Sequence, residues 1–181
     1  EEYDRNGCYS GSAVDNHGVL TLCYTGNVKF DNGSRTAWQC LAVEQPDGTF
    51  KKLGPVLALP EGYTGHVRDP KVWRHDGDWY MVLGAQDLQK RGKVLLFSSP
   101  DLHQWRSEGE IAGDGINGLS DAGYMWECPD LFPLGDQHIL ICCPQGLARE
   151  PHRYLNTYPA TWMSGAWPCA SPQRRSAAPS A

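Results

Sequence analysis

The sequence predicts an all-β protein built from repeated four-stranded antiparallel blades. A motif repeats with its apolar frame intact. Arg68-Asp69-Pro70-Lys71-Val72-Trp73 is followed 59 residues later by Glu127-Cys128-Pro129-Asp130-Leu131-Phe132, and each copy runs into a Gly-Asp turn and a second apolar run. The intervening sequence holds short apolar runs separated by Gly, Asp and Asn, with little helical periodicity. A period of this size filled with short strands is typical of one propeller blade per repeat.

A weaker third copy begins 58 residues before the first. Ser10-Gly11-Ser12-Ala13-Val14 leads to a His17-Gly18 turn and then to an apolar run that ends at Gly26. Hairpins with a central Gly-Asp turn are common in β proteins, so a chance similarity stays open for this copy. If all three copies are real, the chain holds about three blades.

The expected strands follow the turn signals in order. They cover residues 18–26, 36–44, 50–58, 70–74, 79–85 and 94–98. Pro46-Asp47-Gly48 joins the second strand to the third, and His75-Asp76-Gly77-Asp78 joins the fourth to the fifth, because Gly, Asp and Pro supply the backbone angles of tight turns. Residues 99–105 form a polar turn that ends in Trp105 and joins outer strands. Residues 112–123 form a Gly-rich loop, and the second motif opens at Met125.

Composition limits the classes of partner. The 181 residues suffice for one domain with a sizeable core, and the net charge of −5 comes without a basic stripe, which argues against nucleic acid. No apolar run reaches membrane-spanning length, so we expect no membrane partner. The seven cysteines include no C-x-x-C pair, which favours reduced thiols in a cytoplasmic protein and no metal site. The chain opens without Met, so the missing signal peptide carries little information.

Composition changes near the C-terminus. We expect a β-rich domain over residues 1–160 and an atypical tail over 161–181, rich in Ser, Ala, Pro and Arg from Ser164 onward. A segment of this composition buries little apolar surface and is expected to be disordered. It is either a natural flexible tail or an out-of-frame terminus.

Two carboxylates carry the best candidate chemistry. We expect Asp69 and Glu127 at matching positions of adjacent blades, where innermost strands converge on one axial pocket. Paired carboxylates beside an indole, here Trp126, are the usual equipment for glycosidic bond cleavage, because one acid protonates the leaving oxygen and aromatic faces stack on sugars. Arg68 adds hydrogen-bond donors for hydroxyl groups. The alternative is that Arg-Asp before Pro is only a turn.

These residues also resemble a known family. Arg68-Asp69-Pro70, Trp126-Glu127-Cys128-Pro129-Asp130 and Tyr9-Ser10-Gly11-Ser12-Ala13 are similar, in order and separation, to motifs of glycoside hydrolase family 32, over residues 1 to about 160. That family contains invertases, sucrose-6-phosphate hydrolases, fructanases and levanases. The resemblance implies a five-bladed β-propeller that hydrolyses β-fructofuranosides with retention of configuration and without a cofactor. This chain would then be an incomplete propeller.

The resemblance also implies roles for single residues. Glu127 would be the general acid/base, and Asp69 would bind fructosyl hydroxyls and stabilise an oxocarbenium-like transition state, with Arg68 supporting it. The remaining residues of the implied substrate site are Tyr9, Ser10, Trp126 and Cys128. Cys128 would tune the surroundings of the acid/base, or is only a small buried residue.

The motif that carries the family's nucleophile is missing from this sequence. That nucleophile is an Asp in a Trp-Met-Asn-Asp-Pro-Asn-Gly motif, and no such motif occurs among the 181 residues, since Trp162-Met163 is followed by Ser164-Gly165. A retaining glycosidase needs that carboxylate. The sequence therefore predicts a fragment of a β-fructofuranosidase that is inactive as it stands. The alternatives are a non-catalytic carbohydrate-binding propeller piece and the product of a truncated gene. The sequence does not separate sucrose from sucrose 6-phosphate or a fructan as substrate, and it leaves the oligomeric state open.

Overall fold

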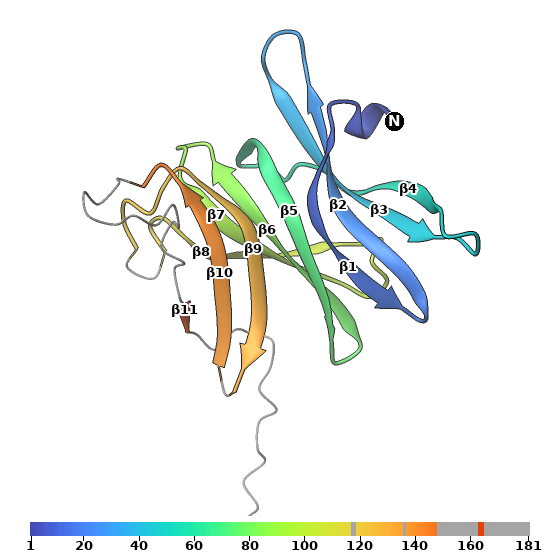
Figure 1. Cartoon of the computed structure of the whole chain (residues 1–181). Helices are drawn as coiled ribbons and strands as arrows, with labels where there is room; N and C mark the ends of the chain where they lie inside the picture. Colours follow the sequence, from blue (N-terminus) through green and yellow to red (C-terminus); the bar gives the residue numbers. More distant parts are fainter. Residues whose placement is uncertain (117–118, 136, 148–162, 165–181) are drawn as a thin grey trace, which may run out of the picture.

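Three antiparallel β-sheets stand side by side in the computed structural model, which describes residues 1–116, 119–135, 137–147 and 163–164 (Figure 1). The helical content of this part is a single short 3-10 turn, η1 (Glu2–Asp4). None of the described helices is long and apolar enough to cross a membrane. The predicted all-β class with four-stranded antiparallel blades is confirmed.

Each sheet is built from strands that are consecutive in sequence. The first contains β1 (Cys8–Asn16), β2 (Val19–Lys29), β3 (Arg35–Glu44) and β4 (Phe50–Leu57). The second contains β5 (Tyr63–His75), β6 (Asp78–Asp87), β7 (Gly92–Ser99) and β8 (Arg106–Gly113). The third contains β9 (Met125–Leu134), β10 (Gln137–Gln145) and β11 (Met163–Ser164). Short turns between neighbouring strands favour this meander order, and the turns that precede β2, β3, β4, β6 and β10 contain Gly.

The expected strands are all present, and most are longer than their sequence signals. The expected hairpin turns hold, and at His17-Gly18 and Asp76-Gly77 both central residues have positive φ, as two-residue turns between twisted strands require. Three described strands were not among those expected: β1, the two-residue β11 and β8. The first five residues of β8 are exposed and lack apolar alternation, so the sequence pattern did not reveal it. The domain boundary expected at residue 160 lies outside the described residues, as does the tail apart from Met163–Ser164.

The second sheet is buried on both faces because it lies between the other two. Along β7, Leu95 and Phe97 pack into a core shared with the first sheet, whereas Val94 and Leu96 pack into a core shared with the third. Successive strand residues point to opposite faces, so an unbroken apolar run fills two cores at once. All eight residues of β7 are accordingly buried.

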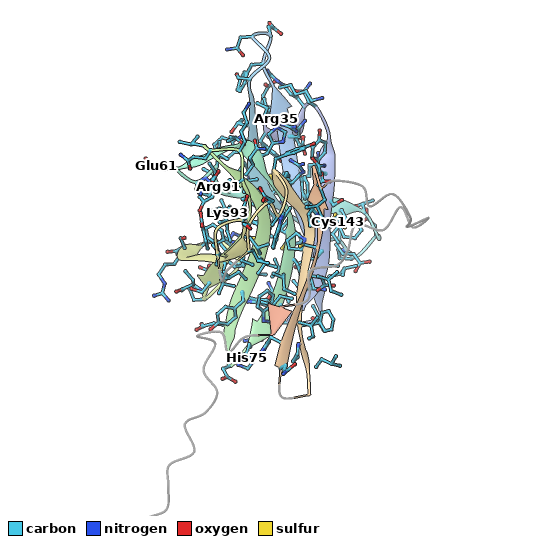
Figure 2. All side chains as sticks on the ribbon, turned by 90° about the vertical axis from the view of Figure 1, so that its left-hand side faces the viewer. Arg35, Glu61, His75, Arg91, Lys93 and Cys143 are labelled. Atoms are coloured by element: carbon cyan, nitrogen blue, oxygen red, sulfur yellow. The ribbon has the colours of Figure 1, made fainter. Side chains whose placement is uncertain are left out.

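The innermost strands β1, β5 and β9 lie next to one another across the three sheets. Ser12 on β1 joins the first two, because its Oγ donates to Pro70 O at 2.9 Å and accepts from Val72 N at 2.9 Å. Figure 2 shows that Arg35 and the His75 turn lie at opposite ends of the molecule, so these strands have a clear upper and lower end.

A β-bulge interrupts each innermost strand at the same point of the repeat. The ladder shifts between Tyr9 and Gly11 in β1 and between Arg68 and Lys71 in β5, and in β9 it shifts between Glu127 and Asp130. The bulges support the weaker third copy but move its register by one residue, since Ser10, aligned with Arg68 by the spacing of 58, lies at the position of Asp69 and Cys128. They also correct one expectation. Asp69 matches Cys128, and Glu127 matches Arg68, so the two carboxylates are offset by one residue.

Candidate active site

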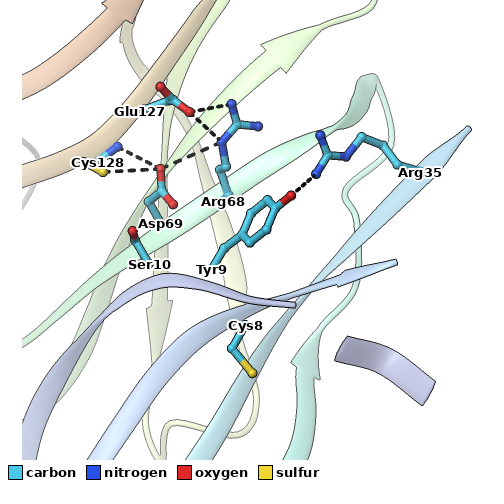
Figure 3. A pocket seen from close by; sticks show the side chains of 8 residues that line it. All are labelled: Cys8, Tyr9, Ser10, Arg35, Arg68, Asp69, Glu127 and Cys128. Atoms are coloured by element: carbon cyan, nitrogen blue, oxygen red, sulfur yellow. Dashed lines mark hydrogen bonds and ion pairs between the residues drawn. The ribbon is translucent and has the colours of Figure 1, made fainter. Parts of the chain in front are cut away.

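A pocket of about 570 Å³ opens where the three innermost strands converge (Figure 3). Its lining residues are Cys8, Tyr9, Ser10, Arg35, Arg68, Asp69, Glu127 and Cys128. Six of the seven site residues expected from the sequence are in this set. Trp126 is not, and Cys8 and Arg35 were not expected.

The bulges of β5 and β9 have an unusual backbone that opens the ladder toward the pocket. Asp69 and Cys128 have φ angles of 65° and 47°, a region that costs non-glycine residues about 1–3 kcal/mol and is concentrated at functional sites. The residue after each is a proline, which has no N–H to lose from the ladder. The Asp69 N–H instead donates to Thr25 Oγ1 at 3.0 Å. Local strain therefore releases both residues from regular pairing.

Asp69 is a buried carboxylate with one oxygen satisfied by protein and one facing the pocket. Its Oδ2 accepts hydrogen bonds from Cys128 N at 2.9 Å and Cys128 Sγ at 3.6 Å. Among the described residues Oδ1 has no hydrogen-bond partner, yet it is not a buried unsatisfied atom, so it remains open to a ligand. Burial raises the pKa of Asp69, while the Cys128 N–H and the Arg68 charge oppose the shift.

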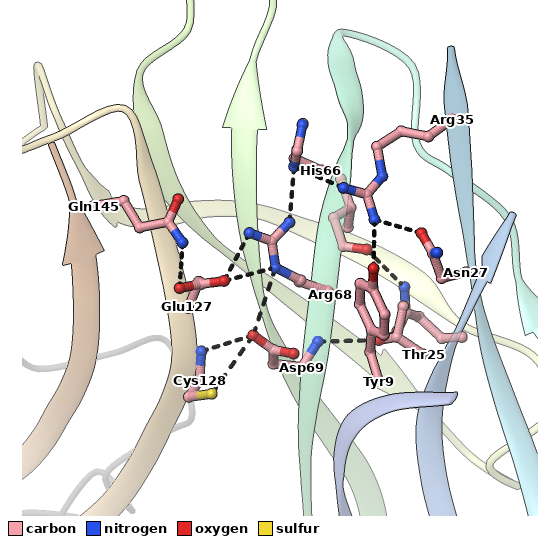
Figure 4. Close-up of polar contacts among 12 residues, drawn as sticks. Tyr9, Thr25, Asn27, Arg35, His66, Arg68, Asp69, Glu127, Cys128 and Gln145 are labelled. Atoms are coloured by element: carbon pink, nitrogen blue, oxygen red, sulfur yellow. Dashed lines mark hydrogen bonds and ion pairs between the residues drawn. The ribbon is translucent and has the colours of Figure 1, made fainter. Parts of the chain in front are cut away.

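Glu127 is held from both sides while its side chain stays about 30% exposed. Arg68 donates to Glu127 Oε1 from Nε at 3.1 Å and from Nη2 at 2.8 Å. Gln145 Nε2 donates to the other oxygen, Oε2 (Figure 4). The carboxylate is therefore fixed in orientation but reachable from the pocket, as a group that exchanges a proton with a ligand must be.

Arg68 links the two carboxylates. Its side chain is buried and hydrogen-bonds Glu127, and its Nε lies 3.9 Å from Asp69 Oδ2. A third contact runs from Nη1 to His66 Nδ1 at 2.9 Å. Planar guanidinium groups suit this arrangement because they donate in several fixed directions at once. Its positive charge also lets two acidic groups share one pocket.

The other expected pocket residues are neutral. Tyr9 accepts a hydrogen bond at its hydroxyl from Arg35 Nη2 at 3.2 Å, and Ser10 lies at the β1 bulge beside Asp69 (Figure 3). Burial, followed by the nearby Asp69 charge, raises the pKa of the Cys128 thiol to about 11. A thiol at neutral pH would donate to Asp69 rather than act as a nucleophile.

Trp126 lies in the core instead of the pocket. Its side chain is fully buried among residues of the second and third sheets, and its Nε1 donates to Ala122 O at 2.6 Å. Gly84 on β6 makes this packing possible, because a Cβ there would come within 2.0 Å of Trp126 O. No face of the indole is left for a sugar, so we expect Trp126 to hold β9 in place.

Several polar residues around the pocket carry no sequence motif that would have revealed them. They are Thr25, Arg35, His66 and Gln145. Gln145 lies two residues beyond Cys143, the pairing partner of Glu127, a relation that only the strand register reveals. Within the described part of the chain, no group of three His, Cys, Asp or Glu side chains is placed to hold a metal ion.

Comparison with known proteins gives one family. The model of the glycosyl hydrolases family 32 N-terminal domain matches residues 1–176. A sucrose-6-phosphate hydrolase of Salmonella typhimurium is 84% identical over 165 residues, which are 91% of this chain and 35% of the relative. A sucrose-6-phosphate hydrolase of Bacillus subtilis is 53% identical over 163 residues, 90% of this chain and 34% of the relative. The chain thus spans about a third of the length of the curated relatives it matches.

Solved structures agree with this family. A family 32 beta-fructofuranosidase of Bombyx mori has a TM-score of 0.75 at 40% identity, over 87% of this chain and 34% of that one. A sucrose-6-phosphate hydrolase of Lactobacillus gasseri has a TM-score of 0.73 at 37% identity, over 81% of this chain and 30% of that one. The three sheets therefore correspond to part of a larger fold.

Proposed function

The chain belongs to glycosyl hydrolase family 32, and on that premise we propose that it is part of a retaining β-fructofuranosidase acting on sucrose or sucrose 6-phosphate. It would supply the general acid/base, Glu127, and the carboxylate that stabilises the transition state, Asp69. The observation that carries this proposal is the shared pocket, in which Arg68 holds Glu127 by two hydrogen bonds and lies beside Asp69.

The two carboxylates suit different steps of glycoside cleavage. Asp69 offers Oδ1 to sugar hydroxyls, and its negative charge lies where positive charge develops on the fructosyl ring. Glu127 is reachable and oriented, so it can protonate the glycosidic oxygen of the leaving sugar. Arg68 occupies Oε1 with two donors, whereas Oε2 accepts only from Gln145, so the second lone pair of Oε2 is the site that can exchange that proton. The same oxygen would later take a proton from the attacking water.

Retention requires a third carboxylate about 5–5.5 Å from the acid/base. The family motif that carries it does not occur among the 181 residues, and Asp69 has another role. We therefore expect the chain by itself to bind the fructosyl unit without turning it over. We place the protein in the cytoplasm, a proposal supported by the six free cysteines of the described part of the chain.

Calorimetric titration of the 181-residue chain with sucrose tests the binding half of this proposal. We expect saturable binding that is lost in Asp69→Ala, because Oδ1 disappears. Asp78→Ala is the matched control, since Asp78 is an exposed aspartate at the opposite end of β5 and β6 and should leave the affinity unchanged. Equal affinities for the two variants would refute a fructosyl site at Asp69.

An assay for released glucose tests the other half. The chain alone should release none from sucrose or sucrose 6-phosphate. Turnover that disappears in Glu127→Gln would show that the chain already holds a nucleophile, contrary to the proposal.

A further inference from the structure

Arg35 lines the pocket, yet it pairs with no carboxylate in the part of the chain that the structure describes. Its guanidinium contacts Tyr9 Oη at 3.2 Å, the Oδ1 of Asn27, and His66 Nδ1 at 3.5 Å. By contrast, Arg68, Arg91 and Arg106 each form an ion pair with an acidic side chain. Arg35 is therefore a half-buried, pocket-facing cation whose partners are uncharged groups.

The neighbouring histidine does not balance this charge. His66 Nδ1 lies 2.9 Å from Arg68 Nη1 and 3.5 Å from Arg35 Nη1, and a guanidinium can only donate. Nδ1 must then be the acceptor, which places the ring proton on Nε2. Burial, followed by the charges of Arg35 and Arg68, lowers the pKa of His66 and keeps the ring neutral. Figure 4 shows Nε2 pointing away from both arginines, and no described residue accepts a hydrogen bond from it.

Arg35 is held firmly in this position. Asn27, whose side chain is completely buried, accepts from Arg35 Nη2 and donates from Nδ2 to Asn6 O at 3.3 Å. Gly65 lets β5 pass directly beneath, because a Cβ there would come within 2.2 Å of Arg35 O. The Arg35 guanidinium also lies over the Tyr9 ring, 5.6 Å from its centroid. The cation is thus built into the pocket wall rather than free in solvent.

The two carboxylates of the pocket both lie beside Arg68, and neither forms an ion pair with Arg35. Arg68 is shared by Asp69 and Glu127, so Arg35 is the cation that an incoming group would meet unpaired. A charge withdrawn from water without a counter-charge is unfavourable, and an anionic ligand would remove that cost. A phosphate monoester fits best, because it offers a double charge and several acceptor oxygens to the donors of Arg35 and His66.

The position of this cation matches one end of a specific substrate. Asp69 marks the fructosyl end, and Glu127 marks the glycosidic oxygen between the two sugars. The row from Arg68 through His66 to Arg35 leads away from Asp69 and Glu127 (Figure 4). We take this side of the pocket as the place of the leaving sugar. We infer that Arg35 and His66 bind the phosphate of sucrose 6-phosphate and that Arg35 selects this substrate over sucrose. This inference rests on the function proposed above.

Titration of the 181-residue chain with four ligands tests this assignment. They are sucrose, sucrose 6-phosphate, glucose 6-phosphate and inorganic phosphate. We expect sucrose 6-phosphate to bind at least about tenfold more tightly than sucrose, the size expected for a charge-assisted hydrogen bond. Arg35→Gln should remove most of that ratio, and Arg35→Lys, which keeps the charge but loses the fork of donors, should retain part of it.

Arg74→Gln is the matched control. Arg74 is an exposed arginine near the far end of β5, stacked over Trp79, and its loss should leave the ratio unchanged. Thermal unfolding of each variant shows whether it is folded. Equal affinities of the unsubstituted chain for sucrose and sucrose 6-phosphate would overturn the inference. So would an Arg35→Gln variant that weakens both sugars equally, because Arg35 would then only support Tyr9.

The other two ligands separate this inference from the proposed function. Glucose 6-phosphate carries the phosphate but no fructosyl unit. If sucrose does not bind while glucose 6-phosphate binds in an Arg35-dependent manner, the fructosyl site fails and the phosphate site stands. If inorganic phosphate binds as tightly as both phosphorylated sugars, Arg35 holds a free anion and the substrate assignment is wrong. No binding by any phosphorylated ligand also overturns it.

Discussion

The bulges of β5 and β9 share a backbone and differ in their side chains. In both, two residues stand opposite one on the partner strand, the first has positive φ, and the second is a proline. Equivalent residues of the two bulges also touch each other. Arg68 binds Glu127 at 2.8 Å, and Asp69 accepts from Cys128 N at 2.9 Å. Convergence of neighbouring blades therefore brings matching positions of the repeat into direct contact.

The difference between the bulges lies in charge and exposure. In β5 the acid is at the strained position and is 6% exposed, with a pKa raised by burial. In β9 the acid is one residue earlier and its side chain is about 30% exposed. A one-residue offset on the same backbone thus gives one carboxylate that is enclosed and one that can exchange protons. Repeats of this kind can distribute distinct tasks without changing the scaffold.

The largest expected effect comes from removing the exposed acid. In a hybrid, residues 1–147 of this chain replace the corresponding segment of the Salmonella typhimurium relative, which supplies the rest of the enzyme. The hybrid should hydrolyse sucrose 6-phosphate. Glu127→Gln should lower its kcat/KM by about 10²–10⁴-fold, the usual contribution of a general acid/base. Steady-state kinetics measures this, and unchanged activity would show that the acid is elsewhere.

A smaller effect is expected on stability when the enclosed acid is neutralised. Because burial raises the folded-state pKa of Asp69, its charged form destabilises the fold at neutral pH, and that cost disappears as pH falls through the raised pKa. Asp69→Asn should raise the free energy of unfolding at neutral pH by about 1 kcal/mol, as substitutions in strained sites often do. The gain should shrink as the pH falls.

Urea unfolding of the 181-residue chain across pH measures this gain. Asp78→Asn serves as the control, since exposed substitutions change stability by less than about 0.5 kcal/mol. If Asp69→Asn instead destabilises the chain at neutral pH, the bonds from Cys128 outweigh the burial of the charge, and Asp69 is a structural carboxylate.

Much of this architecture can be predicted from the sequence, because apolar alternation and Gly-Asp turns are local signals. The carboxylates were expected at matching positions although the 59-residue repeat already aligns Arg68 with Glu127 and Asp69 with Cys128, and the register of the bulges makes this offset plain. Trp126 was misplaced for a simpler reason. Successive strand residues face opposite sides, so the neighbour of a pocket residue points into the core. Arg35 was missed because β3 meets β5 only when the blades pack. His66 and Gln145 share a blade with Arg68 and Glu127, and they were missed because no sequence motif marks them.

Dependence on the leaving group tests most directly whether the two bulges have different tasks. An aryl fructoside releases a phenolate that needs little protonation, whereas sucrose 6-phosphate releases a sugar that needs a proton. In the hybrid, Glu127→Gln should therefore lose much less activity on the aryl fructoside than on sucrose 6-phosphate. Asp69→Asn should lose activity on both to a similar extent, because both pass through the same fructosyl transition state. Equal losses for Glu127→Gln on the two substrates would contradict its role as the acid and with it the division of labour between β5 and β9.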